Sequence, residues 1–313
     1  MASCTFFTVA DSRYWAGVVA LLNSLRLVGH DEPLLVLDAG FTPKQRSILE
    51  PAVEVVPAPA VRAPFLARSL APLARPGGVQ VLLDADLVAV RSLAPLVEEA
   101  ERGRVVAFVD RLATRSFDAW EGLVGAPQRF SHPYVNSGFV ALPSDLGPTV
   151  LESLRDAQQR VDLSSAGLLG RGSVSEPFFF ADQDPLNAVL RAFVPPERLL
   201  ALEHRLAPTE PWDEVVVEDA AALRCVTPDG PEPYLVHVVG PKPWLANVAP
   251  TAYETLLPRL LTGDDVAIRL GRSDLPFRVR WPGLVGREAV PRRVARALGL
   301  RRVVTALGPR LGS

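Results

Sequence analysis

The chain has 313 residues, of which 48% are apolar and 22% are charged, and its formal net charge at pH 7 is −2. This composition is typical of an ordinary globular protein, so it excludes a disordered chain and gives no indication of a nucleic-acid partner. The length is sufficient for one large α/β domain or two small ones with a sizeable core.

Cysteine usage and hydropathy indicate the cellular compartment. The two cysteines, Cys4 and Cys225, lie in separate apolar segments without the spacing of a metal or redox site. We expect them to be buried free thiols in a reducing compartment. The first residues carry no basic region ahead of an apolar stretch, and no apolar run is long enough to cross a bilayer. These features predict a cytoplasmic protein.

The first ninety residues alternate between strand and helix patterns. Short apolar runs rich in β-branched or aromatic residues predict strands at Cys4–Ala10, Leu34–Leu37, Val53–Val56 and from Val81 onward. Helical periodicity predicts helices at Trp15–Val28, Thr42–Leu49 and Phe65–Leu73.

The same alternation continues beyond residue 90. Further strands are expected at Val105–Val109, Tyr134–Leu142 and Tyr234–Val239. Further helices are expected at Leu93–Arg102, Thr149–Val161, Phe178–Leu190 and Thr251–Leu261. The Gly- and Ser-rich stretch Leu163–Pro177 is interpreted as an exposed, mobile loop. Strands and helices at this spacing predict an α/β fold with a mostly parallel central sheet and helices on both faces.

Asp84 and Asp86 stand out because the apolar run that begins at Val81 leads directly into them and apolar residues resume at Leu87. Two carboxylates on an otherwise buried segment are costly unless something pairs with them, and a divalent cation would do so. The alternative is an ordinary turn, in which aspartate is common. The motif alone does not decide between the two.

Other polar residues lie near the ends of predicted strands, where ligands bind to parallel sheets. They are Asp11, Tyr14, Asp110, Asn136 and His237. If these residues converge, His237 becomes a third metal ligand, since imidazole suits Mn²⁺ alongside carboxylates. The alternative for His237 is a hydrogen-bonded histidine in the core.

Four short motifs occur in a fixed order along the chain. They are Asp84-Ala85-Asp86, Val135-Asn136-Ser137-Gly138, Asp182-Gln183-Asp184-Pro185-Leu186-Asn187 and His237…Gly240…Lys242-Pro243-Trp244. In this order they resemble glycosyltransferase family 8, the retaining GT-A enzymes that include glycogenin and bacterial lipooligosaccharide galactosyltransferases. The resemblance covers residues 4 to about 260. One departure is that a single residue separates Gly240 from Lys242, where the common pattern has two.

The resemblance implies a GT-A fold and a set of functional residues. A Mn²⁺ ion, with Mg²⁺ as the alternative, would be held by Asp84, Asp86 and His237. The UDP-sugar donor would be bound by Asp11, Tyr14, Arg68, Asp84, Ala85, Asp86, Asp110, Asn136, Gly240 and Lys242. Gln183 and Asp182 would be catalytic, with Gln183 beneath the anomeric carbon. The GT-A domain would span residues 1–262, followed by an Arg-rich extension over 263–313.

The implied reaction is the retaining transfer of a hexose, galactose or glucose, from a UDP-sugar to a glycan, glycolipid or protein acceptor. An amide is a poor nucleophile, so we favour a front-face reaction over a double displacement. Two alternatives remain open. One is a non-catalytic sugar-nucleotide-binding protein on the same fold. The other is a haloacid-dehalogenase-type phosphatase, whose later motifs would be Lys242 and Gly263-Asp264-Asp265.

The end of the chain is basic. From residue 266 onward eleven arginines stand against two acids, so the rest of the chain is acidic. From Arg292 apolar residues recur at helical spacing, with most arginines off that face. Such a helix is typical of proteins that bind an anionic membrane surface, and it would place this protein at the inner face of the membrane. The alternative is a terminal helix that packs its apolar face on the body.

Overall fold

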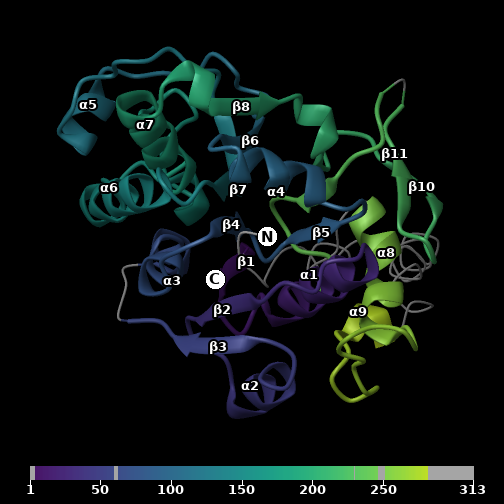
Figure 1. The fold of residues 1–313 in the computed structure, drawn as a ribbon. Helices are drawn as coiled ribbons and strands as arrows, with labels where there is room; N and C mark the ends of the chain where they lie inside the picture. Colours follow the sequence, from purple (N-terminus) through teal and green to yellow (C-terminus); the bar gives the residue numbers. More distant parts are fainter. Residues whose placement is uncertain (1–3, 60–62, 229, 246–250, 281–313) are drawn as a thin grey trace, which may run out of the picture.

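The computed structural model describes residues 4–59, 63–228, 230–245 and 251–280, and its centre is a seven-stranded sheet (Figure 1). The strands in spatial order are β3 Glu54–Pro57, β2 Leu34–Asp38, β1 Cys4–Ala10, β4 Val79–Leu83, β7 Val135–Leu142, β6 Val105–Val109 and β8 Leu199–Leu202. All neighbours are parallel except β7, which runs antiparallel to both β4 and β6. The predicted mostly parallel α/β fold is therefore confirmed.

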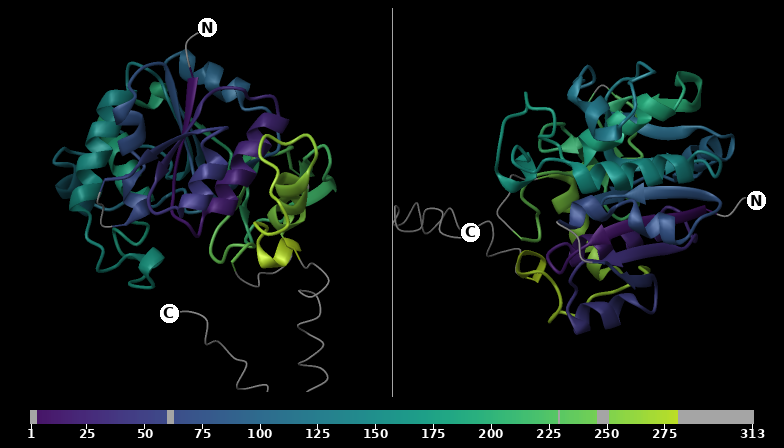
Figure 2. Two further views of the ribbon diagram at one scale, coloured as in Figure 1. Left: turned by 90° about the horizontal axis from the view of Figure 1, so that it is seen from below. Right: turned by 90° about the vertical axis from the view of Figure 1, so that its left-hand side faces the viewer.

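Helices cover both faces of this sheet, as Figure 2 shows. Successive residues of a buried strand point to opposite faces. Val81 and Leu83 of β4 pack in one core with α1 (Trp15–Leu27) and α8 (Ala252–Thr262). Leu82 packs in the other core with α6 (Gly147–Arg160) and α7 (Gln183–Phe193). The remaining helices are α2 Pro43–Leu49, α3 Leu70–Ala74, α4 Ala94–Glu101, α5 Ala119–Val124 and α9 Phe277–Arg280.

A small three-stranded sheet lies beside α1. Its strands in spatial order are β5 Leu87–Ala89, β12 Leu235–Val238 and β9 Thr209–Glu210. The apolar run from Val81 to Val90 is thus divided between two sheets, because the chain leaves the large sheet at Asp84 and enters the small one at Leu87. Leu87 is paired with His237, which brings this histidine beside Asp86.

Two predicted helices differ in extent. The segment 65–73 forms a 3₁₀ turn at Pro64–Ala67 and then α3, and Arg68 between them turns toward Asp84. Helix α7 begins at Gln183 rather than at Phe178, because the backbone N–H of Phe180 donates to the Asp184 carboxylate ahead of the helix. Six further elements escaped prediction because they are short: α5, α9, β8, β9 and the two strands of a hairpin, β10 (Val216–Asp219) and β11 (Arg224–Val226).

Residues 263–280 lie against the body. The side chain of Asn23 on α1 donates to the carbonyls of Leu260 (2.7 Å) and Ile268 (2.8 Å) and accepts from the N–H of Ile268 (2.9 Å). The predicted amphipathic segment from Arg292 lies outside the described residues. Both cysteines are buried free thiols, as predicted. Among the described helices we find none with the length and apolarity needed to span a membrane.

We expect the substitution Asn23→Ala to lower the free energy of unfolding by about 3 kcal/mol. It removes three hydrogen bonds and leaves two buried carbonyls and one buried N–H without partners. Denaturant unfolding measures the change, with Ser47→Ala on the exposed face of α2 as the control. A loss below about 1 kcal/mol would show that the segment after α8 does not depend on this side chain.

Candidate active site

Asp84, Asp86 and His237 form a cluster at the junction of the two sheets. One potential ligand atom from each residue lies within 4.8 Å of the others. His237 Nε2 is 3.8 Å from Asp84 Oδ2 and 3.2 Å from Asp86 Oδ1. The structure thus brings together the three residues that the sequence predicts as metal ligands.

The buried Asp86 lacks a hydrogen bond on one oxygen. Its Oδ2 atom lies 2.5 Å from Lys242 Nζ, whereas Oδ1 faces His237 Nε2 at 3.2 Å without the geometry of a hydrogen bond and accepts none from the other described residues. Burial alone would raise the pKa of Asp86, but the charges of Lys242 and His237 outweigh it and hold that pKa well below its ordinary value. Asp86 is therefore an ionised ligand with a free lone pair. Two carboxylates and an imidazole suit Mn²⁺ or Mg²⁺, so this donor set fits the predicted cation.

Arg68 and Gly138 fix the two sides of the cluster. Arg68 is buried, and its Nη1 atom lies 2.9 Å from Asp84 Oδ1. The N–H of Asp84 donates to the carbonyl of Gly138 (2.9 Å), because β7 begins where its antiparallel neighbour β4 ends. A Cβ atom on Gly138 would lie 2.8 Å from the His237 ring and 2.9 Å from Asn136 Oδ1. The imidazole can occupy its position only because residue 138 is glycine.

A hydrogen-bonded network holds Gln183 beside this cluster. Its Oε1 atom accepts from the backbone N–H of Ser137 (3.0 Å), and its Nε2 atom donates to Asp110 Oδ2 (3.2 Å). Asn136 donates to the same carboxylate oxygen (3.1 Å). The predicted residues Asp110, Asn136 and Gln183 are therefore neighbours. Asn136 contributes from the start of β7 rather than from a strand end.

Asp182 is the N-cap residue of α7 and accepts a hydrogen bond from the hydroxyl of Ser137 (3.2 Å). Burial and the negative charge of Asp84 raise the pKa of Asp182 to about 6, against the opposing effect of Arg68. A carboxyl group that remains partly protonated near neutral pH is thus placed next to Gln183.

The rest of the Asp182–Asn187 motif is structural. Asp184 is fully buried and accepts hydrogen bonds from both Arg115 (2.7 and 2.8 Å) and Tyr134 (2.7 Å). Asn187 makes hydrogen bonds to the backbone N–H and carbonyl of Val135 (both 2.8 Å). These contacts fix α7 on the start of β7. Sequence reasoning missed Arg115, which lies in no motif, and the roles of Ser137 and Gly138, for which the Asn136–Gly138 motif was the available signal.

The remaining predicted donor-binding residues surround the cluster less closely. Asp11 pairs with Arg13 (2.8 Å). Tyr14 lies against Trp244 and beneath Lys242, whose Nζ is 5.6 Å from the ring centroid. Burial, together with the charges of Asp86 and Asp84, raises the pKa of Tyr14, so its phenol stays neutral. Ala85 is buried, and Gly240 has a φ of +72°, a conformation that favours glycine.

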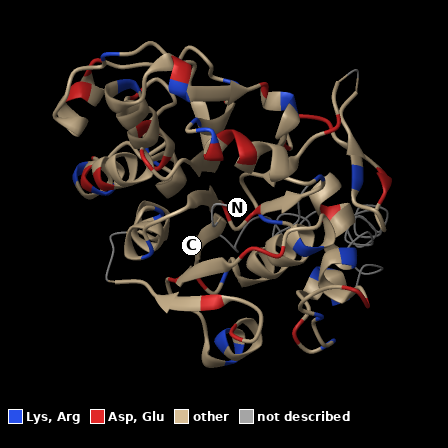
Figure 3. Ribbon diagram, in the orientation of Figure 1, with Lys and Arg blue, Asp and Glu red and all other residues tan. Residues whose placement is uncertain are grey.

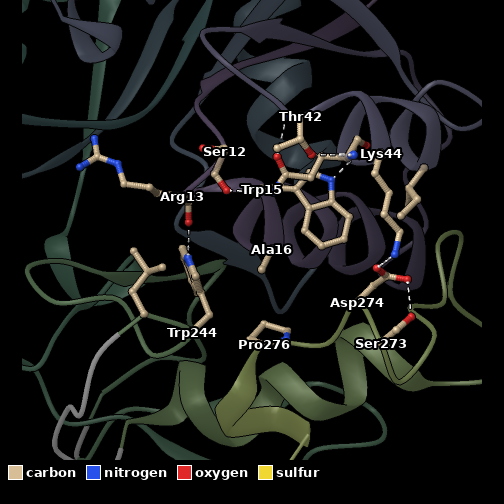
Figure 4. Close-up of a pocket in the computed structure, with 13 residues that line it drawn as sticks. Ser12, Arg13, Trp15, Ala16, Thr42, Lys44, Trp244, Ser273, Asp274 and Pro276 are labelled. Carbon is tan, nitrogen blue, oxygen red and sulfur yellow. Dashed lines mark hydrogen bonds and ion pairs between the residues drawn. The ribbon is translucent and has the colours of Figure 1, made fainter.

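A cavity of about 340 Å³ lies behind this region, between α1, α2 and the segment after α8. Figure 4 shows Trp15, Trp244 and the Lys44–Asp274 ion pair on its walls. None of the predicted metal ligands lines it. Figure 3 shows acidic and basic residues interspersed over the ribbon. Asp264 and Asp265, required by the phosphatase alternative, are exposed and paired with Arg269 and Arg259.

Comparison with known proteins identifies the fold. No protein-family model matches the sequence, and no curated protein matches it. Among solved structures, an active-site mutant of LgtC is 16% identical, with a TM-score of 0.53 over 82% of this chain and 94% of that chain. The galactosyltransferase LgtC in complex with donor and acceptor sugar analogs is 18% identical, with a TM-score of 0.50 over 83% and 98%.

A third neighbour is the apo form of the glycosyltransferase GlyE from Streptococcus pneumoniae TIGR4. It is 13% identical, with a TM-score of 0.53 over 84% of this chain and 61% of that chain. At these identities the likeness shows the fold alone. The chain therefore has the GT-A-like fold of these glycosyltransferases.

We expect Gly138→Ala to weaken Mn²⁺ binding at least tenfold, because the new methyl group would displace the His237 ring. Electron paramagnetic resonance of free Mn²⁺ measures the affinity. Gly122→Ala is the matched control, since a Cβ there meets nothing within 4 Å and the residue lies inside α5. Equal affinities for the two variants would contradict a site formed with His237.

We expect Asp182→Asn to stabilise the protein in a pH-dependent way. The raised pKa means that the native state binds more protons than the unfolded state between about pH 4 and 6, so the stability contributed by this carboxyl falls as the pH rises through that window. The variant should exceed the parent by about 3 kcal/mol at pH 7 and by little at pH 4. Unfolding in EDTA at both pH values tests this, with the exposed Asp31→Asn as control. A pH-independent difference would contradict it.

Proposed function

We propose that this protein is a metal-dependent retaining glycosyltransferase that moves a hexose, galactose or glucose, from a UDP-sugar to a glycan, glycolipid or protein acceptor. The proposal rests on one observation above all. The Asp84–Asp86–His237 cluster, in which the buried Asp86 Oδ1 atom accepts no hydrogen bond, lies next to the Asp110–Asn136–Gln183 network on a glycosyltransferase fold.

Asp84, Asp86 and His237 would hold the cation. A bound Mn²⁺ would offset the negative charge that builds on the departing UDP. Lys242 contacts Asp86 Oδ2, whereas His237 contacts Oδ1. The ammonium group of Lys242 also donates to the carbonyl of Val238 (2.7 Å). A cationic lysine at this place favours binding of the anionic diphosphate over binding of a neutral sugar.

The sugar would be bound by polar groups on the other side of the cluster. Arg68, Asp110 and Asn136 present charged and amide groups suited to hydroxyls. Tyr14 presents an aromatic ring beside Lys242, suited to contact with the uracil base. LgtC was solved in complex with donor and acceptor sugar analogs, which supports a donor and an acceptor sugar as ligands of this fold.

Gln183 would lie beneath the anomeric carbon, where its amide is held by Ser137 and Asp110. An amide held in this way is a weak nucleophile, so we infer a front-face reaction. The bond from the anomeric carbon to the β-phosphate oxygen breaks, and the acceptor oxygen forms its bond on the same face. The acceptor proton passes to the departing phosphate oxygen. The ionised form of Asp182 would stabilise the positive charge that develops on the sugar. LgtC carrying glutamate in place of a glutamine is described as an active-site mutant, in keeping with a role for Gln183.

We expect Mn²⁺-dependent release of UDP from one member of a panel of UDP- and GDP-sugars, abolished by EDTA. Asp86→Asn should lower this rate at least a hundredfold, since it removes an ionised ligand while keeping the shape of the side chain. Nucleotide release is measured chromatographically.

The exposed Asp118→Asn is the matched control and should retain the parent rate. Binding of a UDP-sugar without hydrolysis would favour the non-catalytic binding protein instead. Release of phosphate from a simple aryl phosphate would favour the phosphatase.

A further inference from the structure

Trp212 differs from the other tryptophans of the described residues. Trp15, Trp120 and Trp244 are buried, whereas Trp212 is 63% exposed, the highest value for any large hydrophobic side chain in the described part of the chain. A single exposed apolar residue needs no explanation by itself. Two further features suggest a role for the exposed side chain. The turn that carries it is held by hydrogen bonds, and that turn is linked to residues of the candidate site.

The turn that carries Trp212 is fixed by several hydrogen bonds. The N–H groups of Trp212 and Asp213 both donate to the carbonyl of Thr209 (3.1 Å each), and Asp213 Oδ2 accepts from the N–H of Thr209 (2.8 Å). On the other side, the buried carboxylate of Glu210 accepts from the N–H groups of Ala252 (2.6 Å) and Tyr253 (3.0 Å) at the start of α8. Because the backbone of this turn is already ordered, a ligand that binds there would lose little binding free energy to ordering it.

The same turn is linked to two neighbours of the candidate site. Thr209 on β9 is paired in register with His237, one of the three predicted metal ligands. Arg111 directly follows Asp110, which holds Gln183, and its guanidinium donates to Asp213 Oδ1 (3.0 Å). Trp212 therefore precedes Asp213, whose partner Arg111 follows Asp110 of the Gln183 network. It also lies three residues after Thr209, the residue that pairs with His237.

We propose that Trp212 is a stacking platform for a pyranose ring of the acceptor, an inference that rests on the proposed glycosyl transfer. One face of a pyranose presents C–H groups, which pack on an indole, while its rim carries hydroxyls. Asp213 directly follows Trp212 in the chain, and its ion pair with Arg111 offers donors and an acceptor for those hydroxyls. A large apolar surface with a few polar groups at its edge is the usual composition of a small-molecule site.

The test uses transfer from the active donor to a panel of p-nitrophenyl glycosides. Trp212→Ala should raise the acceptor KM about tenfold or more and lower the ratio of transfer to donor hydrolysis, because ring stacking of this kind contributes about one factor of ten. Trp212→Phe keeps a planar ring and should stay within about threefold of the parent. Phe277→Ala is the matched control, since Phe277 is 61% exposed on α9, far along the chain from these residues.

The outcomes separate the two proposals. A parent protein that hydrolyses no nucleotide sugar would refute the proposed function and this inference with it. Donor hydrolysis with an unchanged acceptor KM in Trp212→Ala, or with no glycoside of the panel accepted, would overturn the stacking platform alone. The same loss in Phe277→Ala would also overturn it, because the effect would then not depend on position.

Discussion

The ion pair between Lys242 and Asp86 connects the two sheets at the point where the chain passes from one to the other. A carboxylate in this position carries a large desolvation penalty, which the lysine and His237 offset only while all three remain in place. Arg68 does the same for Asp84. The arrangement therefore places two carboxylates beside two basic side chains in a partly buried junction, where the carboxylates can attract a divalent cation and the lysine and arginine can attract a diphosphate.

Strand direction explains how the second half of the site reaches this junction. Because β7 runs antiparallel to β4, the beginning of β7 lies beside the end of β4, and Asn136–Gly138 meet Asp84 without a long loop. Because β6 is also antiparallel to β7, Asp110 at the end of β6 arrives at the same edge. Asp184 and Asn187 then fix α7 on β7 and so set the position of Gln183. In an entirely parallel sheet the start of β7 would lie at the opposite edge.

Apolar periodicity was sufficient to predict β1, α1 and the sheet class, because these elements are long and buried. The ordered motifs predicted that Asp84, Asp86 and His237 lie together and that Asp110, Asn136 and Gln183 belong to the same site, but not the hydrogen bonds that join the latter three. The beginning of α7 was predicted wrongly, since the Phe178–Phe180 run looks apolar while its backbone is engaged by Asp184. The antiparallel β7 and the division of the Val81–Val90 run between two sheets depend on pairing with distant segments, which no local pattern reveals. Arg115 was missed for the same reason, as its partner is 69 residues away.

The two sides of the site differ in how freely they can change. On the side of the Asp84–Asp86–His237 cluster, Asp86, His237, Gly138 and Gln183 are interlocked, and a substitution at one of them leaves buried charge or a steric clash at another. On the side of Trp212 the turn is held by backbone groups, Glu210 and Asp213, while the indole is 63% exposed. Such a turn can accept another side chain at residue 212 without losing its shape. In the proposed glycosyltransferase, a replaceable residue at the rim would let the acceptor change with few mutations while the residues proposed to bind the donor stay fixed.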